Sequence, residues 1–339
     1  MSSNESALRE LSVDYPSIGR RLPAPAHHNI ARAIIDSLKK FDPEAGTLTR
    51  LARHWQSSSA ATLVLSSELF EEAEVDQIGV LRDTLFRARP NEEFRIVLVL
   101  RDLMALMLSS YAQKVKFGVK THDFDQFYGE RMQARRVNYF QTAERWAKIF
   151  GWDAMRLRLL DRDYLVNGDL IDDFMAICGI KTDEAREPTL QRPRILNTSP
   201  GWKVLEAARA LFGGCHGLPS DHLLTRAFNR KKKMALGNLA IRVGEKKGWN
   251  DDRGQYFTRP QAQDCVDTFA ASIDGLNACL PNPFPLPPDL EARGFRPREF
   301  LPDVSHIRPD ELRTFYDELR KLNEIKSGRS SREKRRLPG

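Results

Sequence analysis

The segment that most constrains the fold is Phe94–Tyr111, which joins an apolar run directly to a helical pattern. Its first part, Ile96–Leu100, has five aliphatic residues without a polar break, which is typical of a strand buried on both faces. Arg101 ends this run, and apolar residues then recur at helical spacing from Leu103 onward. Ligands bind at the carboxyl ends of the strands in open α/β sheets, so Arg101 is the first candidate for a ligand contact.

Two further segments have the character of strands, and helical patterns separate them. Strands are predicted at Ala61–Leu65 and at Met155–Leu160. The order strand, helix, strand, helix indicates right-handed crossovers. We therefore predict an α/β fold in which a parallel sheet is flanked by helices and the second half of the chain is rich in helix. Irregular structure is predicted over residues 1–25, and helices over 28–40, 47–56, 75–88, 124–150, 200–213, 220–243, 259–279 and 309–324.

Length and composition favour one large soluble domain. A chain of 339 residues can bury a sizeable core, and we predict a single domain over residues 1–325. Residues 326–339 are basic and lack apolar periodicity, so a disordered tail is predicted there. No apolar run approaches the roughly 18 residues of a membrane span. The first residues do not have the basic and then apolar order of a signal peptide, and we expect a cytoplasmic protein.

Cysteine spacing and charge narrow the classes of partner. The cysteines are widely spread, without a CxxC pair or a histidine at ligand spacing, so we expect no metal, and Cys178 and Cys265 are expected to be reduced core residues. A metal or nucleophile role for Cys215–His216, in a loop after two glycines, is the alternative. The four cysteines are Cys178, Cys215, Cys265 and Cys279. Part of the net charge of +7 lies in Arg230–Lys233, a run that forms a solvated face or steers an anionic ligand. Basic motifs interleaved with aromatic residues are missing, so we expect no nucleic-acid partner.

Arg101 and Ser109 have the spacing of a phosphate site. Ser109 follows Arg101 by a little over two helical turns, and a guanidinium with a hydroxyl can hold a phosphate by charge-assisted hydrogen bonds. With Tyr111 next to them, they resemble the 3'-phosphate-binding element of sulfotransferases that use 3'-phosphoadenosine 5'-phosphosulfate (PAPS). Looser similarities to bacterial sulfotransferase-like proteins follow in order at Tyr15–Gly19, Ala26–His28, Leu65–Glu68, Trp146–Gly151, Gly168–Asp169 and Asn197–Pro200.

This resemblance implies a fold, a co-substrate and a reaction. The fold would be that of the P-loop nucleoside triphosphate hydrolases, and PAPS or adenosine 3',5'-bisphosphate would bind to it. A sulfuryl group would pass to a hydroxyl acceptor, either a small molecule or a carbohydrate. The alternatives are a non-catalytic protein that binds a phosphorylated ligand or a glycan, and a kinase relative, although a GxxxxGK[ST] motif is missing.

One departure from the family concerns its first strand and the loop after it. In these enzymes a Lys-containing loop binds the 5'-phosphosulfate through backbone N–H groups and a helix N-terminus. We find no such loop, and we expect the chain to begin near the end of the family's first helix, with its first strand missing and transfer impaired. A misplaced start, a degraded gene and a natively non-catalytic member are the explanations left open. A missing strand also predicts lower solubility or a homodimer.

Five further residues complete the predicted site. Glu68, at the end of a predicted strand, is the first candidate for the general base; its alternative is a surface carboxylate. His27 and His28 are second candidates for the base or for a contact to the acceptor, with a capping or surface role as the alternative. Lys247 and Gly248 resemble the late basic loop that completes the 3'-phosphate site in cytosolic sulfotransferases, and a solvated basic loop is the alternative reading.

Overall fold

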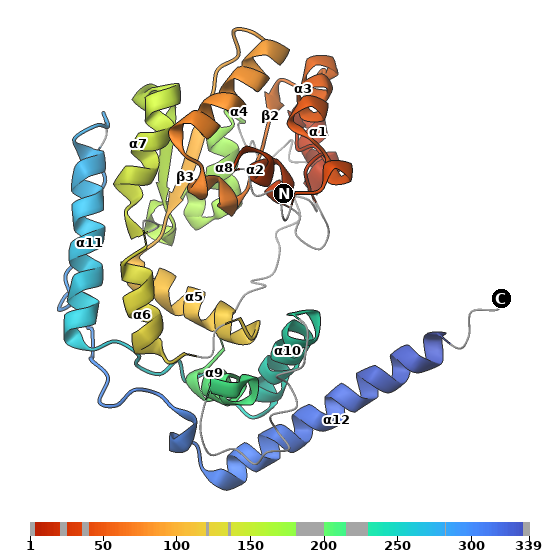
Figure 1. The fold of residues 1–339 in the computed structure, drawn as a ribbon. Coiled ribbons are helices and arrows are strands. Elements are labelled where there is room, and N and C mark those ends of the chain that lie inside the picture. The colour runs from red at the N-terminus through yellow and green to blue at the C-terminus, as the bar shows by residue number, and fades with distance from the viewer. Residues whose placement is uncertain are drawn as a thin grey trace. The chain divides into compact units, whose positions relative to one another are not determined.

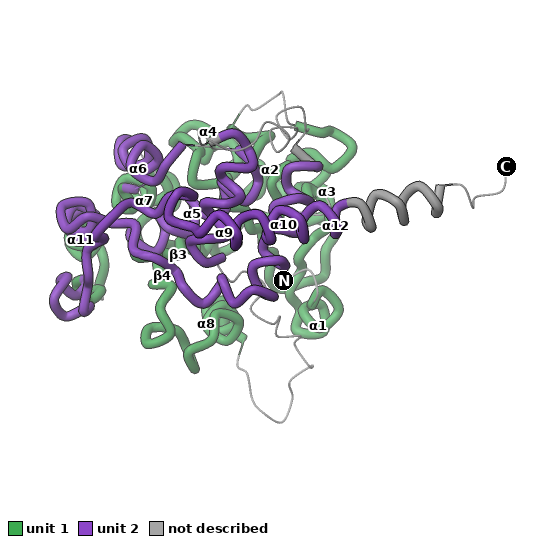
Figure 2. The backbone as a smooth tube through the Cα atoms, turned by 90° about the horizontal axis from the view of Figure 1, so that it is seen from below, with its two compact units in different colours: residues 1–102, 138–194, 269–286 green, residues 103–137, 195–268, 287–339 purple. Residues whose placement is uncertain are grey.

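The computed structural model describes residues 4–20, 26–35, 41–119, 122–134, 137–180, 200–214, 230–281 and 283–334. Two compact units make up the chain (Figure 2), where a single domain over residues 1–325 is predicted. Unit 1 contains residues 1–102, 138–194 and 269–286. Unit 2 contains residues 103–137, 195–268 and 287–339. Each unit is therefore assembled from three separate parts of the chain.

The strands of unit 1 form two parallel pairs. Strand β1 (Val13–Asp14) pairs with β2 (Thr62–Leu63), and β3 (Ile96–Leu100) pairs with β4 (Met155–Leu159). The parallel direction and the bounds of β3 are as predicted. Within the described residues, however, the two pairs are separate sheets of two strands each.

Strand β1 corrects two expectations about the start of the chain. It lies within residues 1–25, where irregular structure is predicted, and so does the helix α1 (Glu5–Glu10). The chain therefore has a strand ahead of its first crossover, where we expected the first strand to be missing. A strand of two residues and a helix of six are too short to show the periodicity that sequence reasoning uses.

The helices of unit 1 begin and end where local chemistry directs them. The Thr47 hydroxyl accepts from the Arg50 N–H at 3.1 Å and caps α3, while Gly151, with φ +84°, follows α7. The predicted helix over 28–40 is described to Ile34, and residues 36–40 lie outside the described parts. The helices are α2 (His28–Ile34), α3 (Leu48–Ser57), α4 (Val75–Ala88), α7 (Tyr139–Phe150), α8 (Leu170–Ile177) and the second half of α11 (Arg259–Asn277).

The predicted long helix over 124–150 is two helices. Helix α6 (Phe124–Met132) belongs to unit 2, and α7 belongs to unit 1. The Asn138 side chain accepts from the Gln141 N–H at 3.0 Å, which caps a new helix. Apolar residues continue at helical spacing on both sides of this cap, so periodicity alone does not show the break.

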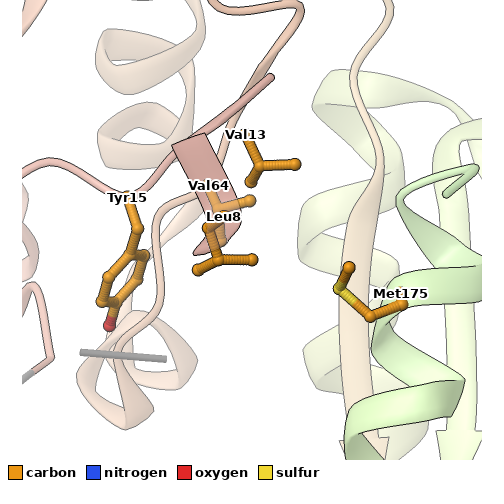
Figure 3. Packing of buried hydrophobic residues seen from close by; sticks show 5 residues of the cluster. All are labelled: Leu8, Val13, Tyr15, Val64 and Met175. Atoms are coloured by element: carbon orange, nitrogen blue, oxygen red, sulfur yellow. The ribbon is translucent and has the colours of Figure 1, made fainter. Parts of the chain in front are cut away.

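A small apolar cluster fixes the β1–β2 pair in unit 1 (Figure 3). Its buried members come from α1, β1, α8 and the residues just after β1 and β2, and they are Leu8, Val13, Tyr15, Val64 and Met175. In Figure 3 the hydroxyl of Tyr15 is directed away from the aliphatic side chains. This packing fixes the residues that follow the two strands, and His27, His28 and Glu68 of the predicted site lie there.

Unit 2 is helical in its described residues. Its helices are α5 (Leu103–Lys116), α6, α9 (Trp202–Arg209), α10 (Arg230–Lys246), the first half of α11, and α12 (Pro309–Lys334), which Figure 1 labels. Helix α12 continues to Lys334, although a disordered tail is predicted from residue 326. Phe315, Tyr316 and Leu319 anchor its first half by burial, and propagating an anchored helix costs less than starting one. Within the described residues no helix is long and apolar enough to span a membrane.

A buried ion pair links four parts of unit 2, and we call it the Glu206 network. Glu206 is fully buried, and its carboxylate accepts from the hydroxyls of Tyr111 and Tyr256, each at 3.2 Å. Arg209 donates to Glu206 at 2.6 Å and to Asp303 at 2.6 Å. Burial raises the pKa of Glu206, and Arg209 and the two hydroxyls oppose that shift. The network joins α5, α9 and the segments that carry Tyr256 and Asp303.

Candidate functional site

The carboxyl ends of β1 and β2 bring together three residues that the sequence predicts for the site. The parallel pairing continues past the strands, because the Val64 N–H donates to the Asp14 carbonyl at 2.9 Å. The hydroxyls of Tyr15 and Ser66 then lie 2.8 Å apart. His27, His28 and Glu68 lie beside these residues, at the start of α2 and just after β2.

His27 crosslinks the two segments that follow β1 and β2. It is fully buried, with Nε2 3.0 Å from the Pro16 carbonyl and Nδ1 3.1 Å from the Ser66 N–H. A carbonyl only accepts and an N–H only donates, so the ring is the neutral Nε2–H tautomer. Burial lowers the pKa of His27 to about 4. Both nitrogens are therefore used within the fold, which favours a positioning role for His27 over its predicted role as a base.

His28, Ser67 and Glu68 form the more reactive part of this region. His28 Nδ1 lies 2.8 Å from the Ser67 hydroxyl oxygen, which also accepts from the Leu69 N–H at 3.1 Å. Burial lowers the pKa of His28, and the nearby Glu68 carboxylate partly opposes that shift. Glu68 is exposed, whereas His28 and Ser67 are half-buried. A neutral imidazole beside a carboxylate can accept a proton, and the carboxylate then stabilises the cation.

The segment Tyr15–Arg20 connects β1 toward α2, where nucleotide-binding α/β proteins place their phosphate loop. Gly19 has φ +83°, and a Cβ atom there would lie 2.2 Å from the Ile30 Cγ1 atom, so only glycine permits this close packing. Arg20 donates to the carbonyls of Pro16 at 2.7 Å and Tyr15 at 3.3 Å. It also pairs with Glu5 at 2.6 Å, so its guanidinium supports the loop from within.

At the carboxyl end of β3, one tyrosine holds the backbone of Arg101. The Tyr139 hydroxyl donates to the Arg101 carbonyl at 2.8 Å and accepts from the Arg101 N–H at 3.3 Å. Burial raises the pKa of Tyr139 to about 12, so the hydroxyl keeps its proton and can make both bonds. Its ring contacts Phe269 edge to face at a centroid distance of 5.9 Å. Tyr139 therefore fixes the backbone of Arg101, the residue predicted to contact an anionic ligand.

The 3₁₀ helix Glu68–Glu72 follows β2 and precedes α4. The charge of Glu71 acts on Tyr139 and contributes to the raised pKa of that hydroxyl. Arg145, on α7, donates to the carbonyls of Glu71 at 2.8 Å and Ala73 at 3.0 Å, which fixes the end of this short helix. The 3₁₀ helix that begins at Glu68 is thus fixed by α7, the helix that carries Tyr139.

Ser109 lies in unit 2, on α5. Its hydroxyl donates to the Leu106 carbonyl at 3.1 Å, within its own helix. The division between the units falls between Asp102 and Leu103, so Arg101 and Ser109 belong to different units. Their pairing around one phosphate therefore stays a prediction.

Lys247 and Gly248 form the turn that ends α10. Gly248 has φ +68°, and the Trp249 N–H donates to the Gly244 carbonyl at 2.9 Å, as in a glycine C-cap. Lys247 pairs with Glu318 of α12 at 3.2 Å. A helix C-terminus carries a negative partial charge and disfavours phosphate. This geometry favours a structural role over the predicted phosphate contact, and a glycine after a basic helix end is the signal that indicates it.

The sequence does not single out Ser67 and Tyr139 as residues of the candidate site. Ser67 lies in the Leu65–Glu68 segment that resembles the sulfotransferases, but only the fold brings it to His28. Tyr139 fits the apolar pattern of its helix, so no local signal separates it from a core residue. Some predictions concern residues outside the described parts of the chain. These are the sulfotransferase-like segment at residues 197–199, the first part of the predicted helix, 220–229, and Cys215. Within the described parts, no group of His, Cys, Asp or Glu side chains is arranged to hold a metal ion.

Comparison with models of protein families, with curated proteins and with solved structures finds no match.

Proposed function

We propose that the chain is a sulfotransferase-like protein that transfers a sulfuryl group from PAPS to the hydroxyl of a small-molecule or carbohydrate acceptor, with transfer impaired by the loss of the Lys-containing 5'-phosphosulfate loop. One observation supports this proposal: unit 1 has a basic residue and a proton acceptor at the carboxyl ends of parallel strands. Arg101 follows β3, and His28, at the start of α2, lies beside Ser67, which follows β2. The carboxyl edge of parallel strands is where α/β proteins bind nucleotides.

In the proposed reaction the acceptor oxygen attacks the sulfur atom. The new S–O bond forms while the bond from sulfur to the 5'-phosphate oxygen breaks, and adenosine 3',5'-bisphosphate leaves with the electron pair. We assign the His28 Nδ1–H as the donor to Ser67, so that Nε2 has a lone pair for the acceptor proton. Glu68 stabilises the resulting imidazolium, and Arg101 holds the 3'-phosphate.

Arg101→Ala is expected to weaken the binding of adenosine 3',5'-bisphosphate at least tenfold, because it removes a charge-assisted contact to the 3'-phosphate. Calorimetric titration measures this directly. Adenosine 5'-phosphate, which lacks the 3'-phosphate, should bind both proteins equally. Arg82→Ala is the matched control, because Arg82 lies on α4 and pairs with Asp83 on the surface. A folded wild-type chain that does not bind the bisphosphate would contradict the proposed function.

The pH dependence of transfer should report on His28. Its pKa is lowered by burial, so the base is neutral, and transfer proceeds, down to a pH below the ordinary histidine range. Glu68→Gln removes the charge that raises this pKa, so the acid limb of the rate profile should move to lower pH. His28→Gln should remove the limb together with most of the activity. Initial rates with labelled PAPS from pH 4.5 to 8 test this, and an unmoved limb in Glu68→Gln would exclude His28 as the base.

A second candidate is a non-catalytic protein that binds a phosphorylated ligand or a glycan. The pairing of Arg20 with Glu5 favours it, because the described loop after β1 then has its only cation already engaged. Residues 15–20 also contain no lysine. Binding of the bisphosphate that depends on Arg101, together with no transfer to any acceptor tested, would select this function.

A further inference from the structure

Charge is divided unevenly between the two units. Unit 2 has 31 Lys and Arg against 20 Asp and Glu, a net charge of +11. Unit 1 has 22 against 26, a net charge of −4, and together the units give the +7 of the chain. A strong asymmetry of this kind points to an anionic partner for the basic part.

Two basic helix ends meet in unit 2, where α5 and α10 lie side by side (Figures 1 and 2). Helix α5 ends with Lys114 and Lys116, and the first turn of α10 contains Lys232 and Lys233 but no acidic residue. The Lys233 ammonium donates to the Gly118 carbonyl at 3.5 Å. We call these four lysines the lysine patch. Cations at a helix N-terminus oppose the helix dipole, and an anion bound beside α10 would relieve that cost.

Apolar side chains accompany the lysine patch. Val119, just after α5, is 53% exposed, and Phe117 beside it is half-buried. The Lys116 ammonium lies 5.7 Å from the centre of the Phe117 ring. Lysines with an exposed aliphatic residue suit the boundary of a bilayer, where ammonium groups contact headgroups and apolar groups enter the acyl region.

The use of lysine instead of arginine at these two helix ends indicates which kind of anionic partner the patch fits. Arginine is the usual residue where phosphate or sulfate is held in two-pronged geometry, as in sites for nucleic acid. The basic residues at these two helix ends are instead lysines, apart from Arg230. Lysine acts as a point charge and suits diffuse attraction to many headgroups.

We propose that the lysine patch, with Val119, docks unit 2 on a membrane surface rich in anionic lipids. The lysines supply attraction to the headgroups, and Val119 supplies shallow apolar contact. This inference does not depend on the proposed reaction, because it concerns a different unit and different residues.

Sedimentation of the full chain with vesicles tests the proposal. Vesicles of phosphatidylcholine with about one-third phosphatidylserine should bind the chain at about 0.1 M salt, and vesicles of phosphatidylcholine alone should not. The double variant Lys116→Gln/Lys232→Gln should lose binding about fivefold for each lysine removed. Lys246→Gln/Lys321→Gln changes two exposed lysines elsewhere in unit 2 and is the matched control.

Three results would overturn the proposal. The first is equal binding to both kinds of vesicle, and the second is equal loss in the patch and control variants. The third is binding of a sulfated polysaccharide through the patch without binding to vesicles, which would assign the patch to a glycan instead. Val119→Ser leaves the charge unchanged, and reduced vesicle binding by this variant would support insertion even if the double lysine variant folds poorly.

Discussion

Replacing Glu206 with alanine is expected to lower the free energy of unfolding of unit 2 by about 3–5 kcal/mol. The change leaves the Arg209 charge buried with Asp303 as its remaining carboxylate in the Glu206 network. It also leaves the hydroxyls of Tyr111 and Tyr256 without their shared acceptor. A loss of this size is a large share of the 5–15 kcal/mol that stabilises a typical domain.

Urea denaturation, followed by the fluorescence of Trp202 and Trp249 in unit 2, measures this effect. The tryptophans of unit 1 are replaced by phenylalanine in the background so that the signal reports unit 2. Glu318→Ala is the matched control, because Glu318 is partly exposed and pairs with Lys247 at 3.2 Å. A pair of that kind contributes about 0–1 kcal/mol. Equal losses of unfolding free energy in the two variants would show that the buried Glu206 network stabilises unit 2 no more than an exposed ion pair does.

Gly237→Ala is expected to destabilise unit 2 by about 3 kcal/mol, at the upper end of the cost of overpacking. A Cβ atom at Gly237 would lie 1.8 Å from the Lys116 carbonyl oxygen and 2.8 Å from its carbonyl carbon. Both atoms are backbone, so the end of α5 and the helix α10 have to move apart. The same movement would spread the lysine patch.

The control for Gly237→Ala is the same substitution at a helical glycine with open surroundings. At Gly129, on α6, a new Cβ would meet no described atom within 4 Å apart from its chain neighbours and the backbone of its own helix. Alanine is a better helix former than glycine, so Gly129→Ala should stabilise unit 2 by up to about 1 kcal/mol. Thermal melting of both variants checks the opposite signs. A melting temperature unchanged by Gly237→Ala would refute the close approach of α5 and α10.

The parts of the fold that sequence reasoning predicts well are those with strong local patterns. The bounds of α4 (Val75–Ala88) and β3 (Ile96–Leu100) are confirmed to the residue. Strand β1 escapes prediction because two residues cannot show alternation. The break at Asn138 escapes prediction because a cap is a side-chain contact that leaves the apolar spacing unchanged.

The candidate site is predictable to a smaller degree. Residue type and position at a strand end select Glu68 and Arg101 as candidates. The different surroundings of His27 and His28 depend on burial among segments distant in the sequence, so neighbours in the chain give no sign of them. Tyr139 reaches Arg101 across 38 positions, a contact that no spacing rule contains.

The division of unit 1 into three chain segments has a consequence for the order in which the protein is made. Its last segment, residues 269–286, leaves the ribosome after most of unit 2 has been synthesised. Until then Tyr139 has no Phe269 against its ring, and Phe140 has no Gly275 beside it. The residue that holds the Arg101 backbone is therefore fully supported only late in synthesis. Nascent chains that stop before residue 269 should have a more mobile β3 end than the finished protein.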